Sequence, residues 1–569
     1  MVEKMTSKLT RLELTWPGKE DRFNPEPRIL LEDKEKSFSY EKNTDGFAKE
    51  FFDRMEVESK VKPTYNNMLI HGDNLLALKA LEQDYTGKVK CIYIDPPYNT
   101  GNAFEHYDDG LEHSIWLSLM RDRLELLQRL LDRTGVIFVS IDDNEYAYLK
   151  VLMDEIFLRK NYCGTLVWEK KKKPSFLNAN MGGITEYILA YAKDRNYSPP
   201  FVGGYTTENK KYPINNAGNS VQILTFPPES VEFNCPDGFI QPQDMSEGNI
   251  ITELLDKLEI LHGRNKNAFR LKGEWRYSQK KLDEIIANKE RILISKIPFR
   301  PNHIKSGNEP KKMKNLLSIA HYNMATYEDA TEESRNLFGD HDAFGYPKPE
   351  KLIQTLISAV TEPGDLVLDS FLGSGTTAAV AQKMGRRWIG VEMGDHVYTH
   401  CLPRLQKVIK GEDAGGVTKA TGWTCGGGFK FYELASSLIV KDKYGQQIIS
   451  DKYNGDMLAE AMCKILGYHY KPDAEKYWKQ GFSSEKSFIF TTTMSVQEES
   501  LDKLAAEVGD NHLLICCSAF VGNKSAFPNI TVKKIPSAIL KKCEWGREGY
   551  PLNLKDYKPT DEEFEFEEE

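Results

Sequence analysis

Short apolar runs alternate with amphipathic stretches in two separate parts of the chain. In the first part, we expect strands at 68–73, 90–95, 135–142 and 184–192, with helices at 74–81, 111–133 and 144–157. In the second part, we expect a helix at 350–360, a strand at 365–369, a helix from Thr376 and a strand at 387–392. Continuous apolar strands of this kind are typical of a sheet that is buried on both faces.

The segment between these two parts, about 199–343, is polar and irregular, with Gly, Pro and Asn throughout. Alternating strands and helices on both sides of it predict one doubly wound α/β domain that this insertion splits. Gly426–Gly428 indicates a hinge before a small α/β module. We therefore expect the divisions 1–60 (an N-terminal arm), 61–198, 199–343, 344–414 and 415–569.

Composition limits the class of protein. Of 569 residues, 40% are hydrophobic and 28% are charged, which is typical of a soluble globular protein. No apolar run approaches the roughly 20 residues of a membrane span, and the first residues do not resemble a signal peptide. The nine cysteines are scattered and form no metal-binding pattern, so we expect reduced thiols, a cytoplasmic location and no metal. Cys516 and Cys517 lie in an apolar run, 512–520, that predicts a buried strand.

The net charge of −9 is unfavourable for phosphate binding, but much of it is local. The last nine residues, 561–569, are acidic except for Phe564 and Phe566, and such a block is typical of a solvated, disordered tail. The rest of the chain is close to neutral, so total charge neither supports nor excludes a nucleic-acid partner.

A glycine-rich loop follows the predicted strand 365–369, with the sequence Asp-Ser-Phe-Leu-Gly-Ser-Gly-Thr-Thr over 369–377. Glycines at a strand-to-helix turn allow a ligand to approach the backbone closely. Glu392 ends the next strand, where a carboxylate can accept both ribose hydroxyls of an adenosine cofactor. A structural turn or a dinucleotide site is an equally good interpretation of the loop alone. The dinucleotide site is weakened because Ala378 stands where its third fingerprint glycine would be. An ATP-binding phosphate loop is weakened because the chain contains no Gly-Lys-Ser/Thr run.

A second loop, Asp95-Pro96-Pro97-Tyr98, directly follows the predicted strand 90–95. One interpretation is a rigid turn at the end of a strand, with Tyr98 covering the core. It also suits the activation of an amine on an aromatic base, because Asp95 and the Pro96 carbonyl can accept from both N–H bonds while the prolines fix the backbone. Tyr98 can stack on a base that has left the duplex.

Together the two loops resemble the amino-methyltransferases of DNA, and their order along the chain resembles the permuted β class of that family. The segments 69–75, 92–101 and 138–143 more narrowly resemble modification (Mod) subunits of type III restriction–modification systems. The resemblance covers roughly 60–200 and 340–435. It implies a Rossmann-like methyltransferase fold, S-adenosylmethionine as cofactor, and methyl transfer to the N6 amino group of adenine in double-stranded DNA. It makes 61–198 the catalytic half, 199–343 the target-recognition domain and 344–414 the cofactor-binding half.

The resemblance also assigns roles to individual residues. Asp95, Pro96, Pro97 and Tyr98 would hold the target amine. The cofactor-binding residues would be Asp73, Asn74, Lys348, Pro349, Asp369, Phe371, Gly373, Gly375, Thr376 and Glu392, although Asp73 and Asn74 can equally form the turn after a strand. The family further implies a homodimer and an ATP-dependent restriction (Res) subunit as partner.

Basic residues in and beside the insertion are candidates for DNA contact, although solvated surface is the commoner explanation of such residues. They are Lys170, Lys171, Lys172, Lys173, Arg276, Arg300, Lys311 and Lys312. Three alternatives stay open: an N4-cytosine methyltransferase, an RNA or protein-amide methyltransferase, and a DNA-recognition or assembly subunit of a restriction complex. Methylation at carbon five of cytosine is disfavoured because no Pro-Cys pair is present.

Overall fold

The computed structural model describes residues 13–40, 61–99, 109–174, 180–305, 307–341, 344–523 and 526–550, with the side chains of 109–112 left out. The acidic tail predicted at 561–569 lies outside these residues. The described chain divides into two compact units, Phe201–Met313 and the remainder. The smaller unit is shorter than the insertion predicted at 199–343, because residues from Lys314 onward belong to the larger unit.

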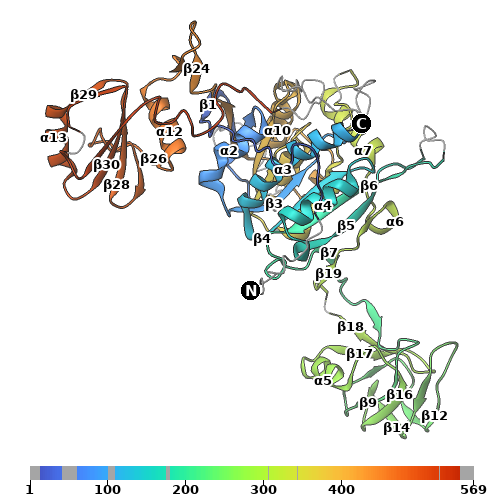
Figure 1. The fold of residues 1–569 in the computed structure, drawn as a ribbon. Coiled ribbons are helices and arrows are strands. Elements are labelled where there is room, and N and C mark those ends of the chain that lie inside the picture. Colours follow the sequence, from blue (N-terminus) through green and yellow to red (C-terminus); the bar gives the residue numbers. More distant parts are fainter. Residues whose placement is uncertain are drawn as a thin grey trace, which may run out of the picture. The chain divides into compact units, whose positions relative to one another are not determined.

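A ten-stranded sheet forms the centre of the larger unit as far as the chain is described (Figure 1). Its order is β1-β23-β2-β22-β21-β3-β4-β6-β5-β20. The bounds are β1 Leu30–Tyr40, β2 Asn67–His71, β3 Val89–Ile94, β4 Leu131–Ile141, β5 Tyr162–Glu169, β6 Thr185–Ala192, β20 Leu316–Leu317, β21 Leu366–Asp369, β22 Arg387–Glu392 and β23 Gly427–Leu434. The strands from β23 to β4 are parallel, whereas β1 is antiparallel to β23 and β6 is antiparallel to both β4 and β5. The first strands of the chain therefore flank strands from its last third.

Helices cover both faces of this sheet. They are α2 Asn74–Tyr85, α3 Asp109–Leu130, α4 Tyr146–Ile156, α6 Ile319–Tyr322, α7 Tyr327–Phe338, α8 Glu350–Val360, α9 Thr376–Lys383 and α10 Leu402–Lys410. Helices α2, α3 and α4 share one apolar cluster with alternate residues of the strands, including Ile92 and Ile94. Helices α8, α9 and α10 contact one another, and their buried residues lie outside that cluster. The doubly wound α/β fold expected from the sequence is confirmed.

Two features of the ends of this sheet differ from the prediction. The predicted N-terminal arm, 1–60, contains β1, which pairs with β23 through residues such as Phe38 and Phe429. Gly427 and Gly428, predicted as part of a hinge, are the first residues of β23. Both strands were missed because neither is a continuous apolar run: β1 alternates charged and apolar side chains, as an edge strand can.

After β23 the chain forms a small α/β module within the larger unit. A five-stranded sheet has the order β26-β27-β28-β30-β32, and its last three strands are parallel. The bounds are β24 Ile439–Lys441, β25 Gln447–Ile449, α12 Gly455–Leu466, β26 His469–Tyr470, β27 Gly481–Ser484, β28 Ser487–Thr491, β29 Ser495–Gln497, α13 Glu498–Val508, β30 His512–Cys517, β31 Ala519–Val521 and β32 Ile530–Lys534. Cys516 and Cys517 are buried in β30, as predicted.

The smaller unit, Phe201–Met313, consists mainly of short strands around a core of its own that includes Phe226, Phe269 and Trp275. Its sheets have the orders β11-β14-β15-β10-β17-β18-β8, β12-β13-β16-β9 and β19-β7, and one helix, α5 Gln279–Ala287, packs on this core. The strand bounds are β7 Val202–Tyr205, β8 Lys211–Pro213, β9 Val221–Phe226, β10 Glu232–Phe233, β11 Gly238–Ile240, β12 Gln243–Asp244, β13 Thr252–Leu254, β14 Leu258–Leu261, β15 Arg264–Asn265, β16 Phe269–Glu274, β17 Arg291–Ile294, β18 Pro301–Ile304 and β19 Pro310–Lys312.

Candidate active site

The carboxyl edge of the parallel strands gathers the chemistry that the sequence predicts. Asp95 follows β3, Asp369 ends β21 and Glu392 ends β22, and these three strands are neighbours in the order β22-β21-β3. The register pairs Val367 with Cys91, so the two predicted loops leave the sheet side by side. The fold therefore brings together two loops that lie far apart in the sequence.

The loop after β3 is held by its own residues and by a helix. The Trp116 indole N–H donates to the Pro97 carbonyl at 2.9 Å, which ties the loop to α3. The Tyr98 hydroxyl donates to Asp95 Oδ1 at 2.8 Å. The Asp95 side chain is 25% exposed, so its carboxylate stays accessible although the surrounding residues are buried.

Lys348, predicted to line the cofactor, reaches this loop. Its Nζ lies 2.8 Å from Asp95 Oδ2 and donates to the hydroxyls of Tyr98 and Tyr327 at 2.9 and 2.8 Å. Burial alone would lower the pKa of Lys348, but Asp95 and Glu186 outweigh it and raise that pKa well above its ordinary value. Lys348 is therefore a charged ammonium between two carboxylates.

Glu186, on β6, is a member of the site that the sequence analysis missed. Its side chain is 4% exposed, and Oε2 accepts from Tyr98 at 3.2 Å and from Tyr327 at 3.0 Å. Oε1 accepts from Lys170 at 3.0 Å. Because β6 is antiparallel to β4, the residue near its amino end lies at the edge where the parallel strands end. We call Asp95, Tyr98, Glu186, Tyr327 and Lys348 the reaction-centre cluster.

The glycine-rich loop turns with left-handed backbone at Gly373 (φ 56°) and Gly375 (φ 82°). The Gly373 N–H donates to Glu392 Oε2 at 2.7 Å, and Oε1 accepts from the N–H groups of Met393 and Gly394 at 2.8 and 2.9 Å. Burial would raise the pKa of Glu392, but His396 and these N–H groups lower it below its ordinary value. Glu392 is thus an ionised acceptor held against the loop.

These features fit an adenosine cofactor. Oε2 of Glu392 accepts one N–H bond and retains a lone pair for a ribose hydroxyl. A Cβ at Gly373 would have the ring of Phe344 as its nearest neighbour, at 3.9 Å, so glycine leaves open space between the loop and this ring. The loop and its acid can therefore hold the predicted group.

Asp369, Phe371 and Thr376 form the base of the loop. Burial raises the pKa of Asp369 to about 7, against the lowering effect of its hydrogen bonds with Thr377 and with the Phe371 N–H, the latter at 2.9 Å. Phe371 packs on the apolar cluster of α2 to α4, and Thr376 Oγ1 accepts from Arg404 at 2.8 Å. Asp369 and Thr376 are only 2% and 4% exposed, so both support the loop from beneath.

A second set of buried charges lies behind this loop. Lys383 Nζ is 2.8 Å from Glu350 Oε2 and 2.7 Å from Asp413 Oδ2, and Arg404 is 2.9 Å from Glu350 Oε1. All four side chains are at most 3% exposed. We call Lys383, Glu350, Arg404 and Asp413 the closed cluster. Pro349, predicted at the cofactor, caps the amino end of α8 immediately before Glu350.

Asp73 and Asn74 have structural partners. Asp73 caps α2 through Oδ1, and its Oδ2 accepts from the Tyr550 N–H at 2.8 Å and lies 3.4 Å from Arg123. The Asn74 amide donates to the Ser370 carbonyl at 2.9 Å and accepts from Arg123 at 2.5 Å. Asp73 is 4% exposed, so the turn-forming role accounts for it, and Asn74 links α2 to the glycine loop.

The predicted DNA-contacting residues fall into two groups. Lys170 and Lys172 pair with Glu186 and Asp329, and the Arg300 guanidinium donates to the carbonyls of Met245 and Phe299. The exposed members are Lys172, Lys173, Arg276, Lys311 and Lys312, and Lys171 is partly exposed. Lys170 and Arg300 therefore support local structure.

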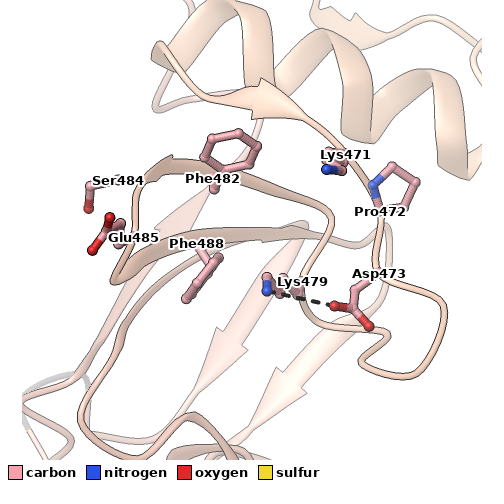
Figure 2. Close-up of a pocket in the computed structure, with 8 residues that line it drawn as sticks. All are labelled: Lys471, Pro472, Asp473, Lys479, Phe482, Ser484, Glu485 and Phe488. Atoms are coloured by element: carbon pink, nitrogen blue, oxygen red, sulfur yellow. Dashed lines mark ion pairs between the residues drawn. The ribbon is translucent and has the colours of Figure 1, made fainter.

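A pocket of about 640 Å³ lies in the module after β23 (Figure 2). Phe482 and Phe488 face it from paired strands, and Lys479 lies 3.6 Å from Asp473 at its other side. The remaining lining residues are Lys471, Pro472, Ser484 and Glu485. The lining shares no residue with the predicted catalytic or cofactor site.

The described residues contain neither a cluster of metal-binding side chains nor a membrane-spanning helix. No three His, Cys, Asp or Glu side chains gather there as a metal site. Nor does any helix among them have the length and apolar character needed to cross a membrane.

The sequence is similar to known restriction–modification proteins and DNA methyltransferases. The chain is 33% identical over 464 residues to the probable type III restriction-modification enzyme HindVI Mod subunit of Haemophilus influenzae, covering 72% of this chain and 59% of that protein. It is 30% identical over 361 residues to the StyLTI Mod subunit of Salmonella typhimurium, covering 55% and 49%. It is 29% identical over 396 residues to the type II methyltransferase M.EcaI of Enterobacter cloacae, covering 67% and 75%.

The chain thus spans only 59% and 49% of the lengths of the two Mod subunits. The model of the N6 and N4 DNA methylases, described as "DNA methylase", matches residues 89–401, from β3 through the glycine loop. This match includes both loops of the carboxyl edge and covers more than half of the chain, so the protein belongs to the DNA methylase family.

Proposed function

We propose that this protein is an S-adenosylmethionine-dependent methyltransferase that modifies the N6 amino group of adenine in duplex DNA. The observation that carries the proposal is the placement of Asp95 and Tyr98 directly after β3, next to the glycine loop that follows β21. When bound, S-adenosylmethionine supplies a methyl group activated on a sulfonium. Gly373, Gly375 and Glu392 would hold it, as would Phe371, Lys348 and Pro349 by resemblance.

The residues of the loop have separate tasks in this proposal. The Asp95 carboxylate and the Pro96 carbonyl accept from the two N–H bonds of the target amine and direct its lone pair. Tyr98 stacks on the displaced base, which must leave the duplex to reach the edge of the sheet. The work of the protein is positioning and charge stabilisation, and no covalent intermediate with a side chain is required.

Adenine is favoured over cytosine by Asp at the first position of the loop, since N4-cytosine enzymes of this family more often carry Ser there. The unit Phe201–Met313 is our candidate for target recognition, since it has its own core and displays Arg276, Lys311 and Lys312. The Mod names of two relatives support a role as modification subunit with a Res subunit, and we keep homodimerisation as part of this proposal.

The test uses the purified chain, labelled S-adenosylmethionine and duplex DNA. We expect label on adenine, and a loss of transfer of about a hundredfold or more in Asp95→Ala, with cofactor binding retained. Asp365→Asn, at the opposite end of β21, is the matched control and should transfer normally. Transfer that survives Asp95→Ala contradicts the mechanism, and modification-aware sequencing of DNA from expressing cells identifies the base and its site.

A further inference from the structure

The Asp95 carboxylate is already engaged by the protein. Tyr98 donates to Oδ1 at 2.8 Å, and the Lys348 ammonium lies 2.8 Å from Oδ2. A neutral aromatic amine is a weaker donor than an ammonium, so it cannot displace Lys348 on equal terms. The amine of the base therefore reaches Asp95 Oδ2 once Lys348 moves to another partner.

Glu186 is placed to receive it. Lys348 Nζ lies 3.6 Å from Glu186 Oε2, just beyond hydrogen-bond range, and its contact with Tyr327 at 2.8 Å lies on the same side, since Tyr327 also donates to Glu186. A movement of less than about 1 Å would turn the longer contact into a hydrogen bond. Because the ammonium is buried, leaving Asp95 without a second anion would be strongly unfavourable.

We infer that Glu186 is a positioning residue that takes the Lys348 ammonium from Asp95 when the target amine enters, and so frees Oδ2 to accept from it. This inference rests on the proposed function. Glu186 touches neither base nor cofactor in this arrangement; it acts through Lys348. The second cation beside Glu186 is Lys170, which donates to Oε1 and keeps this contact during the handover.

The test is a set of substitutions in the full chain. Glu186→Gln keeps the size of the side chain but removes its charge, so Lys348 stays on Asp95, and we expect kcat to fall about tenfold or more with S-adenosylmethionine affinity unchanged. Adding Lys348→Met removes the competing ammonium. Because Lys348 is also proposed to hold the cofactor, kcat is measured at saturating S-adenosylmethionine, and we expect at least about threefold recovery of kcat. Lys170→Met, added to Glu186→Gln in the same way, is the matched control. Lys170 pairs with Glu186 but not with Asp95, so this double variant should show no recovery of kcat.

A second readout separates capture of the base from chemistry. Duplex DNA with 2-aminopurine beside the mapped target adenine, which keeps its own 6-amino group, should gain less fluorescence with Glu186→Gln than with the unaltered chain. The double variant should restore this gain. Glu186→Asp keeps the charge and should retain more transfer than Glu186→Gln, and thermal unfolding of each variant excludes loss of fold.

Full transfer by Glu186→Gln, or a double variant no better than the single one, overturns the handover of Lys348. Either result leaves the proposed function intact, provided that the unaltered chain methylates DNA and Asp95→Ala does not. Failure of the unaltered chain to methylate DNA would instead reject the proposed function.

Discussion

The reaction-centre cluster and the closed cluster both bury a lysine between two carboxylates, yet they differ in what surrounds the charges. In the closed cluster, Lys383 lies within 2.8 Å of both Glu350 and Asp413, and none of the three side chains is more than 3% exposed. In the reaction-centre cluster, Lys348 is close to Asp95 but 3.6 Å from Glu186, and Asp95 is 25% exposed. In one cluster each carboxylate has a buried cation within 2.9 Å; the other keeps one carboxylate accessible and one contact incomplete.

Under the proposed function, this difference distinguishes ions that support the fold from ions that act on a substrate. A fully desolvated charge is tolerated when every partner is in place, and such a set is rigid. The closed cluster has this character, and through Arg404 it supports the glycine loop at Thr376. The reaction-centre cluster also contains two tyrosine hydroxyls that can exchange partners, which a binding site for an incoming amine requires.

The largest expected effect is on the closed cluster. Lys383→Met leaves Glu350 and Asp413 without their shared cation, and we expect a loss of about 3–5 kcal/mol of unfolding free energy. Calorimetry of the larger unit measures it. Lys430→Met, in the same unit, removes the exposed partner of Glu32 and should cost at most about 0.5 kcal/mol. Equal effects of the two substitutions would show that the closed cluster is not desolvated.

A smaller effect is expected at the reaction centre. Lys348→Met leaves Asp95 without a cation, whereas Glu186 keeps Lys170. Water can reach Asp95 at the edge of the sheet, so we expect a loss of about 1–2 kcal/mol. The same calorimetric measurement applies. A loss as large as that of Lys383→Met would mean that the two clusters are equally closed, and the comparison would fail.

The smallest effect concerns pH. Burial beside Glu350 raises the pKa of Glu333 to about 7, above its ordinary value of 4.5. The folded chain therefore binds this proton more tightly than the unfolded chain, so its stabilising contribution is complete below pH 4.5 and is lost as pH rises toward about 7.

Glu333→Gln should remove this pH dependence and make the protein more stable than the unaltered chain at pH 8. Unfolding between pH 5 and 8 measures the difference. Glu332→Gln, one residue earlier and exposed, is the control and should leave the slope unchanged.

The parts of the fold that the sequence predicts are those with a local signal. The buried strands β2, β3, β4, β21 and β22 are continuous apolar runs, and Asp95, Asp369 and Glu392 stand at their ends. The rule that carboxyl ends of parallel strands meet at one edge is then enough to bring the two loops together.

The rest depends on pairing between distant segments. Glu186 follows Thr185 at the start of an ordinary strand, and only the antiparallel direction of β6 places it beside Tyr98. Lys170 looked like part of a basic surface run, whereas it pairs with Glu186. An acid at the amino end of a strand that follows the catalytic strands is the signal that would have found Glu186.

The order of strands also has a consequence for how the protein is made. Strands β2 and β3 are synthesised early, but β22 and β21 lie between them in the sheet. Strand β1 can pair only after β23, Gly427–Leu434, has been synthesised. The strands of Phe201–Met313 pair only among themselves, so that unit is completed first. During translation, the apolar strand β2 therefore lacks both of its neighbours, β22 and β23, for several hundred residues, and it is a stretch that a chaperone has to shield.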